Sequence, residues 1–297
     1  MNIKKAGIIT ICGRPNVGKS TLTNKLAGEK IAIVSDKPQT TRNRITAVVN
    51  RGESQFVFLD TPGLHKARTR LGDYMVKVVK ESVADVDGVM LLVEPIPHIG
   101  APEAELIARI KTLGVPSMLV INKIDSIQKE ELLAVMAAYG QAHDWDAVMP
   151  ISAQTGEGVE EMMGILEHWL PEGPQLFPED MITDQPERQI MAEIVREKLL
   201  RSLDKEVPHG VAVEITKFSQ RDNDIIDVHA TIYCEKESHK GIIIGKGGAM
   251  LKKVSSQARA DMERFMGEKA YLETWVKVKE NWRDNPAAIQ NFGYTED

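Results

Sequence analysis

Three short motifs in the first half of the chain carry residue types that bind a nucleotide. The first, Gly13-Arg-Pro-Asn-Val-Gly-Lys-Ser20, lies between an apolar run and a helical stretch and fits the phosphate-loop pattern G-x-x-x-x-G-K-[ST]. Its glycines let several backbone N–H groups point at one anion, its lysine can reach the β- and γ-phosphates, and its serine hydroxyl can bind Mg²⁺. The predicted phosphate-binding residues are Gly13, Arg14, Pro15, Asn16, Val17, Gly18, Lys19, Ser20 and Thr21.

The second motif, Asp60-Thr-Pro-Gly63, ends an apolar run at residues 56–59. A carboxylate at a strand end can hold a metal-bound water, and the Gly63 amide can contact a terminal phosphate. Alone, this tetrapeptide is a common turn. Its position, one strand–helix–strand unit after the phosphate loop, favours a role for Asp60, Thr61, Pro62 and Gly63 at the nucleotide, with Asp60 and Ser20 at the metal.

The third motif, Asn122-Lys-Ile-Asp125, ends another apolar run and has the chemistry to recognise guanine. Asp125 can accept hydrogen bonds from N1–H and the exocyclic amino group, which adenine does not offer, and such a polar site discriminates by roughly 10⁴-fold. We expect Asn122 to tie the loop together and the Lys123 stem to cover the base. Ser152 and Ala153 follow the last strand, where the Ala153 amide could contact the guanine oxygen.

A different motif, Gly245-Lys-Gly-Gly248, stands in the second half after an isoleucine run. No acidic residue occurs from position 239 to 260, so the flanking lysines form a local basic patch in a chain of net charge -6. A lone G-x-x-G is more often an ordinary helix–helix turn. The apolar run, the acid-free flank and the order of elements favour RNA binding by Gly245, Lys246, Gly247, Gly248, Lys252 and Lys253. Trp275 and Trp282 could stack on bases, but Trp275 alternates with apolar neighbours and is interpreted as packed.

The elements that must position the nucleotide motifs alternate between short strands and longer helices. Strands are predicted at 7–12, 45–50, 55–60, 89–94, 117–122 and 147–151, and helices at 19–27, 73–84, 101–112, 129–142 and 159–168. This alternation predicts an α/β fold with a mostly parallel sheet covered by helices on both faces. Ligands then bind at the carboxyl ends of the strands, where all three motifs begin.

A proline-rich stretch near residues 171–178 predicts a linker. We expect a nucleotide domain at 1–172, a linker at 173–185 and a smaller α+β domain at 186–297. The second domain is predicted as a helix at 186–202, strands at 210–218 and 225–235, two short helices around 244–248, and a strand at 270–278.

Composition narrows the class of protein further. The chain has 297 residues and only two cysteines, Cys12 and Cys234, both in apolar runs. Buried free thiols in a reducing compartment are therefore expected. We expect neither a cleavable signal peptide nor a membrane-spanning segment, since the N-terminal apolar run leads directly into the phosphate loop and no apolar run approaches ~20 residues.

Together, the motifs of residues 7–170 resemble those of translation-factor-type GTPases. The resemblance implies GTP and GDP as ligands, Mg²⁺ as cofactor, and a switch segment made of Gln39, Thr40, Thr41, Arg42 and Asn43. Within this segment, Thr41 rather than Thr40 is expected to contact Mg²⁺ and the γ-phosphate.

Leu64 departs from the pattern, because many signalling GTPases carry a water-orienting glutamine at this switch position. Related bacterial GTPases with asparagine at the Asn16 position use K⁺ near the phosphates, so K⁺ is a candidate cofactor. A scaffold that binds GTP and RNA with little catalysis of its own stays open, with Leu64 as its best support. A metabolic enzyme such as a kinase is the other alternative, and residues 122–125 argue against an ATP-dependent version.

The second domain resembles a KH domain of the type common in bacterial proteins, which clamps about four nucleotides of single-stranded nucleic acid at its G-x-x-G loop. The whole chain resembles the Era-like class of bacterial GTPases, including the segments at residues 38–44 and 275–283. This resemblance implies binding near the 3′ end of small-subunit ribosomal RNA and assistance in assembling the small subunit. It also implies a cytoplasmic monomer with peripheral association at the inner membrane.

Overall fold

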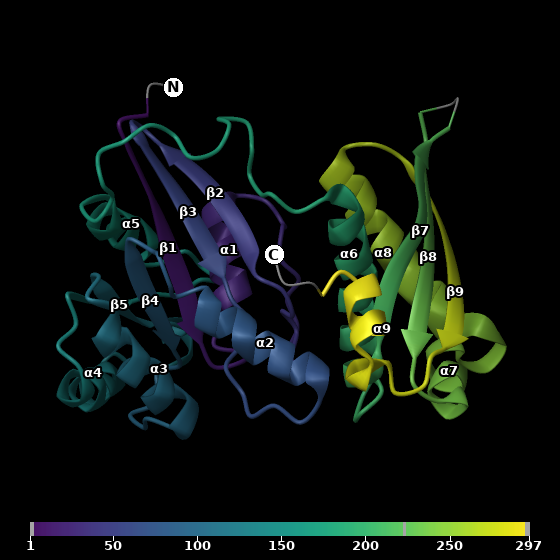
Figure 1. The fold of residues 1–297 in the computed structure, drawn as a ribbon, viewed down its shortest axis with the longest axis horizontal. Coiled ribbons are helices and arrows are strands. Elements are labelled where there is room, and N and C mark those ends of the chain that lie inside the picture. Colours follow the sequence, from purple (N-terminus) through teal and green to yellow (C-terminus); the bar gives the residue numbers. More distant parts are fainter. Residues whose placement is uncertain (1–2, 222–223, 295–297) are drawn as a thin grey trace. The chain divides into compact units, whose positions relative to one another are not determined.

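The computed structural model describes residues 3–221 and 224–294, and contacts within the chain divide it into two compact units (Figure 1). The nucleotide unit comprises Met1–Ala32, Thr41–Lys66 and Met75–Asp184. The KH unit comprises Gln185–Asp297 together with two short segments from the first half of the chain, Ile33–Thr40 and Ala67–Tyr74.

The nucleotide unit is built on one six-stranded sheet in the order β2-β3-β1-β4-β5-β6. Its strands are β1 (Lys5–Gly13), β2 (Ile45–Arg51), β3 (Ser54–Asp60), β4 (Gly88–Val93), β5 (Ser117–Ile121) and β6 (Ala147–Pro150). All neighbours pair in parallel except β2 and β3, which form an antiparallel hairpin. The mostly parallel sheet is therefore confirmed. The strand order reverses at β1, between β3 and β4, which is where such folds bind ligands.

Helices cover both faces of this sheet, because its strands are apolar on both sides. The helices are α1 (Lys19–Ala27), α2 (Arg70–Glu81), α3 (Ala101–Leu113), α4 (Glu131–Ala142) and α5 (Val159–Glu167); of α2, only the part from Met75 onward belongs to this unit. Ile9 and Ile11 of β1 belong to one buried cluster with Leu22 of α1, whereas Cys12 belongs to another with Ile107 of α3. Side chains of β1 thus point alternately into two apolar cores, one on each face of the sheet, and these cores hold the carboxyl ends of the strands in place.

The stretch after α5 is attached to the β2–β3 hairpin. The Val48 N–H of β2 donates to the Ile182 carbonyl at 2.9 Å. The Gln55 side chain accepts from the N–H groups of Leu176 and Phe177 at 2.7 and 2.9 Å. Much of the proline-rich stretch is therefore bonded to the nucleotide unit.

The KH unit contains a three-stranded sheet in the order β7-β8-β9, with β7 antiparallel and β9 parallel to β8. Its elements are α6 (Glu187–Ser202), β7 (Ala212–Gln220), β8 (Ile226–Cys234), α7 (Glu237–Ile244), α8 (Ala249–Met266), β9 (Ala270–Val278) and α9 (Pro286–Asn291). Its short 3₁₀ turns are at Pro208–Gly210, Lys246–Gly248 and Trp282–Asp284, and a further one, Ile124–Ser126, is in the nucleotide unit. The expected order of helix, two strands, two helices and strand is confirmed.

Two expectations for this unit are wrong. Helix α8, which follows the glycine loop, is not short but has 18 residues. Val254, Ala258 and Met262 place a buried side chain on the same face at every fourth position, which extends the helix along the core. Trp275 is not buried, since 40% of its surface is exposed, although the edge of its ring contacts His229 with 5.3 Å between the ring centroids. Trp282 is fully buried and donates its ring N–H to the Gly210 carbonyl at 2.9 Å, so it is a core residue.

Cys12 and Cys234 are both buried and free, as expected. Burial raises the pKa of the Cys12 thiol to about 12. Within the described part of the chain, no helix has the length and apolar character needed to cross a membrane.

Candidate nucleotide and RNA sites

The carboxyl ends of the parallel strands bring the predicted nucleotide motifs to one edge of the sheet. Gly13 ends β1, Asp60 ends β3, Asn122 follows β5 and Ser152 lies two residues beyond β6. Because these strands are neighbours in the sheet, the four loops lie next to one another. The spacing of the motifs in sequence is therefore converted into a single site.

The phosphate loop has the curled backbone that an anion nest requires. Gly13, Asn16 and Gly18 all have positive φ, at 151°, 66° and 101°. A Cβ on Gly18 would lie 2.1 Å from the Asn122 amide nitrogen, so only glycine fits there. The buried Lys19 ammonium donates to the Arg14 carbonyl at 2.8 Å and to the Gly13 carbonyl at 3.2 Å. Burial lowers the pKa of Lys19, although nearby Asp60 acts in the opposite direction.

Three oxygen-bearing side chains meet beside this loop and fit a Mg²⁺ ion. Ser20 Oγ donates to Asp60 Oδ2 at 2.7 Å and lies 2.8 Å from Thr41 Oγ1. The other carboxylate oxygen, Asp60 Oδ1, is buried without a hydrogen-bond partner. Burial raises the pKa of Asp60 to about 6, while Lys19 and Ser20 lower it. A hard cation with oxygen ligands matches this donor set, since it would compensate the buried carboxylate.

The loop after Asp60 packs tightly on the phosphate loop. A Cβ on Gly63 would lie 2.5 Å from the Pro15 nitrogen, and the Leu64 N–H donates to the Gly13 carbonyl at 3.3 Å. The Leu64 side chain is buried in an apolar cluster. It thus contributes packing and offers no group that could orient water. Thr61 donates its hydroxyl to the Ile11 carbonyl at 3.0 Å, which anchors the start of this loop.

Asn122 connects three loops through its side-chain amide. Its Nδ2 donates to the Val17 carbonyl at 2.8 Å, and its Oδ1 accepts from the Ala153 N–H at 2.9 Å. Asn122 thus joins its own loop to the phosphate loop and to the loop after β6, as expected. The same bond occupies the N–H that the sequence analysis assigned to the guanine oxygen, so a role of Ala153 in base recognition stays a prediction.

Lys123 and Asp125 lie in the loop that follows Asn122. Lys123 has a positive φ of 65° and donates to the Asn16 carbonyl at 2.7 Å, so its stem spans the distance to the phosphate loop. Asp125 is exposed at the following turn. Ser152 is fully buried and accepts from the Thr155 N–H at 3.1 Å, which shapes the loop after β6.

Sequence reasoning missed Glu94, which directly follows β4. Its carboxylate pairs with Arg14 at 3.3 Å and with Lys123 at 2.6 Å, and so connects the phosphate loop with the base loop. Its position at the carboxyl end of a central strand was the available signal.

The residues predicted to bind RNA gather at one end of the KH unit. Gly245 has φ 73°, and a Cβ there would lie 2.7 Å from the Met250 Cβ, so the loop requires glycine at this position. Gly247 and Gly248 also have positive φ, with no atom within 4 Å of an added Cβ. Lys246 of the loop is exposed, as are Lys252 and Lys253 on α8. Ile242 on α7, the first residue of the isoleucine run before the loop, is 50% exposed.

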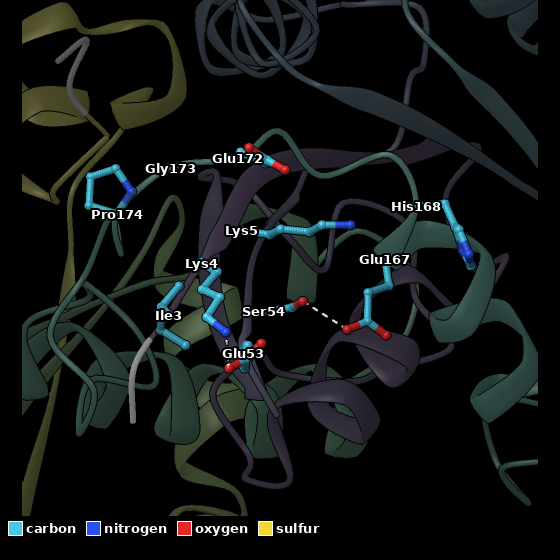
Figure 2. A pocket seen from close by; sticks show the side chains of 10 residues that line it. All are labelled: Ile3, Lys4, Lys5, Glu53, Ser54, Glu167, His168, Glu172, Gly173 and Pro174. Carbon is cyan, nitrogen blue, oxygen red and sulfur yellow. Dashed lines mark hydrogen bonds and ion pairs between the residues drawn. The ribbon is translucent and has the colours of Figure 1, made fainter.

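A further cavity, of about 840 Å³, opens at the amino end of β1 and β3, at the opposite end of these strands from the nucleotide motifs (Figure 2). Its lining charges are partly satisfied by one another: Lys4 pairs with Glu53 at 2.6 Å, and Ser54 donates to Glu167 at 2.8 Å. None of the predicted site residues lies there. This cavity is therefore separate from the nucleotide site.

Known proteins resemble both halves of the chain. Residues 8–123 match the family described as "50S ribosome-binding GTPase", and residues 206–283 match "KH domain". The chain is 52% identical to GTPase Era of Alkaliphilus metalliredigens over 98% of its length and 99% of that protein. It is 50% identical to GTPase Era of Ruminiclostridium cellulolyticum, over 98% of this chain and 97% of that protein.

Solved structures agree with these relatives. A crystal structure of a variant of Aquifex aeolicus Era bound to GDP and AlF₄⁻ is 39% identical, covers 98% of this chain and 100% of its own, and has a TM-score of 0.95. A second, of Era in complex with MgGDPNP and nucleotides 1506–1542 of 16S ribosomal RNA, is 38% identical over 99% of this chain and 100% of its own, also with a TM-score of 0.95. By sequence identity over nearly its whole length and by fold, the chain belongs to the GTPase Era family.

Proposed function

We propose that this GTPase is a nucleotide-controlled RNA-binding protein whose KH unit binds small-subunit ribosomal RNA near its 3′ end and assists assembly of the small subunit. The observation that carries the proposal is the joint presence of a guanine-nucleotide site and a basic glycine loop in one chain. The relative solved with nucleotides 1506–1542 of 16S ribosomal RNA supports this RNA target. The family described as "50S ribosome-binding GTPase" matches only residues 8–123, so its description does not apply to the KH half that we assign to RNA.

In the nucleotide half, we assign each motif a place around GTP. The loop at residues 13–20 surrounds the phosphates, with Lys19 against the β- and γ-phosphates. Ser20 and Thr41 ligate Mg²⁺ directly, and Asp60 holds a metal-bound water. Asp125 reads the guanine edge. The hydroxyl–carboxylate cluster around Asp60 and the buried Lys19 ammonium support these assignments.

The missing glutamine leads to a proposal about cations. Since Leu64 is buried and apolar, charge that develops between the β- and γ-phosphates needs another stabilising group. We assign this role to K⁺ held near Asn16, in the phosphate loop. The alternative, a GTP- and RNA-binding scaffold with little catalysis of its own, is favoured by the same Leu64.

Single-turnover hydrolysis of GTP tests the cation directly. We expect hydrolysis to be several-fold faster in K⁺ than in Na⁺ at equal ionic strength, and Asn16→Ala to remove most of that difference. Equal rates in the two salts would contradict the K⁺ proposal. Hydrolysis no faster than that of free GTP in either salt, with or without RNA, would favour the scaffold.

In the RNA half, the open faces of Gly247 and Gly248 let a sugar–phosphate backbone approach the loop closely. The exposed Lys246 and the amino end of α8 favour its negative charge. The exposed Ile242 beside the loop offers an apolar contact to a base. These features suit single-stranded RNA, whose bases are free to turn toward the protein.

The experiment for this half places two aspartates in the loop, as Lys246→Asp with Gly247→Asp. Aspartate tolerates positive φ, so the loop should keep its shape while its charge changes from +1 to -2. We expect the affinity for a short RNA from the small-subunit 3′ end to fall by at least 30-fold with GTP affinity unchanged. A matched control is Lys269→Asp, outside the glycine loop. Unchanged RNA affinity in the loop variant would contradict the proposal.

Nucleotide state and RNA affinity are coupled in this proposal, because GTP and Mg²⁺ order the switch loops and hydrolysis releases them. Linkage then requires RNA to favour the GTP form by the same factor by which GTP favours RNA binding. Equal RNA affinity with a GTP analogue, GDP and no nucleotide would refute the coupling. A cytoplasmic location, peripheral association with the inner membrane and a monomeric state are proposed from the family resemblance alone.

A further inference from the structure

A cavity of about 390 Å³ lies between α6 and α8 of the KH unit, two helices that are side by side in Figure 1. Leu199 of α6 and Ala258 of α8 belong to one buried apolar cluster, so the helices are held together from inside. The walls of the cavity are almost entirely polar or charged: Lys198, Arg201 and Ser202 on α6, and Lys253, Gln257 and Asp261 on α8. The cavity is therefore suited to a polar or charged group and not to an apolar one.

Lys198 is the buried cation of this cavity, and it is paired with Glu197 at 2.7 Å and with Asp261. Desolvation by burial lowers the pKa of Lys198, but its hydrogen bonds to Asp261 and Glu197 outweigh this, so the pKa is raised and the ammonium stays charged. Glu197 is also paired with Arg201 at 3.1 Å. Asp261 is also paired with Arg264 at 2.9 Å. Three cations thus surround two carboxylates, which leaves a net positive charge at the cavity.

The other donors of the lining have no partner in the protein. Among the described residues, the Lys253 ammonium, the Gln257 side-chain amide and the Ser202 hydroxyl form no hydrogen bond or ion pair. Lys253 and Gln257 are four positions apart on α8, so they lie on the same face of the helix. Free N–H and O–H donors around a positively charged cavity match an oxyanion, whose oxygens accept charge-assisted hydrogen bonds.

We propose that this cavity binds a phosphate group of the RNA strand beyond the glycine loop, which rests on the proposed binding of RNA by the KH unit. An α-helix rises ~1.5 Å per residue, so Lys253 and Gln257 lie about 8 and 14 Å along α8 from Gly248, the last residue of the loop. Phosphates of one strand follow each other at ~3.4 Å or more along its axis, so an RNA strand reaches the cavity within about four nucleotides of the loop.

A phosphate within an RNA strand suits this cavity better than a free phosphate, because the glycine loop already holds the strand nearby. The second contact of a ligand that is held at one point is intramolecular, with an effective concentration of about millimolar for a short flexible connection. A lipid phosphate is disfavoured, because Ala260 is the one apolar residue in the described lining and nothing there could enter a bilayer. The loop and the cavity together select RNA long enough to reach both.

The test measures RNA affinity of the full chain against salt concentration. It uses two RNAs from the small-subunit 3′ end, one of about four nucleotides, the length that the loop clamps, and one of about twelve. Gln257→Glu keeps the shape of the side chain but places a carboxylate in the cavity. We expect affinity for the longer RNA to fall by about fivefold, and the slope of its log K against log[salt] to become shallower by about 0.7, the value of one single-strand phosphate contact. Affinity for the shorter RNA should stay within about twofold.

A second variant and a control bracket this result. Ser202→Asp reaches the cavity from α6 and should reproduce the effect on the longer RNA, which a strand bound along α8 alone would not require. Gln220→Glu makes the same chemical change as Gln257→Glu at the exposed end of β7, outside the cavity, and should leave both affinities and the salt slope unchanged.

Several outcomes would overturn the cavity as an RNA phosphate site. One is a native affinity and salt slope of Gln257→Glu for the longer RNA. Another is an equal loss in Gln257→Glu and Gln220→Glu, which would be an effect of overall charge. A third is binding of inorganic phosphate or of phosphatidylglycerol vesicles that Gln257→Glu removes while RNA affinity is unaffected, which would assign the cavity to a free or a lipid phosphate.

The loop variant Lys246→Asp with Gly247→Asp separates this inference from the proposed function. If the loop variant loses both RNAs but Gln257→Glu loses neither, the cavity is not a phosphate site while RNA binding by the loop stands. If the loop variant binds both RNAs with native affinity, the proposed function fails and the role of the cavity fails with it.

Discussion

Replacing Lys19 with alanine should abolish useful nucleotide binding. Its ammonium is buried within the phosphate loop and now donates to two loop carbonyls, which it would exchange for phosphate oxygens. Removing one partner of a buried, hydrogen-bonded charge pair costs about 2–5 kcal/mol, or roughly 30- to 5,000-fold in affinity. Calorimetric titration of Lys19→Ala with GTP and GDP measures this loss.

The matched control for that loss is Lys111→Ala, at the exposed last turn of α3. Helix α3 leads into the amino end of β5, away from the phosphate loop, so we expect native affinity for both nucleotides. Binding of GTP by Lys19→Ala within threefold of the native chain would contradict the site as assigned.

The second large effect is a change of base preference in Asp125→Asn. An asparagine can accept one hydrogen bond from N1–H but meets the exocyclic amino group of guanine with its own amino group. We expect GTP affinity to fall by roughly 10³- to 10⁴-fold, because a polar site with unpaired groups rejects its former ligand strongly. Xanthosine triphosphate carries a carbonyl at that position, so its affinity should rise until it exceeds that of GTP.

Competition of GTP, ATP and xanthosine triphosphate for the variant measures the preference. Asp144→Asn makes the same chemical change at an exposed residue before β6, away from the carboxyl edge of the sheet, and should keep the native order. An Asp125→Asn variant that still prefers GTP to xanthosine triphosphate would show that another residue reads the base.

The α/β class and the order of elements in both halves could be predicted because local signals agree with the fold. In β1, apolar residues on both sides indicate a strand buried on two faces, and Gly13 ends it where the loop must curl. The prediction of a short helix after the glycine loop was wrong, since α8 has 18 residues. The buried side chains at every fourth position up to Met262 carried the correct signal.

Exposure was harder to predict than secondary structure. Trp275 alternates with apolar residues in β9, yet only one face of that strand packs on the helices, and the tryptophan is on the other. Alternation identifies two faces but does not say which of them is covered when both carry large apolar residues.

The candidate site could be predicted wherever a motif is contiguous. The cavity between α6 and α8 could not, because Lys198 and Asp261 are 63 positions apart and lysine in a helix ordinarily indicates a solvated face. Only the fold reveals that this lysine is buried. Glu94 lies between these cases, since its place after β4 was visible but its two cationic partners were not.

The segment that follows the proline-rich stretch is bonded to β2, and this bears on self-association of the protein. β2 is the outermost strand of its sheet, and an uncovered outermost strand is a template on which another chain can add a strand of its own. The Ile182 carbonyl accepts from the Val48 N–H and the Glu179 carbonyl accepts from the Asn50 side-chain amide, so part of this edge is occupied. The segment that leads to the KH unit thus also covers part of the β2 edge. Removing it would expose that edge to pairing with a strand of another chain, as well as separating the two activities.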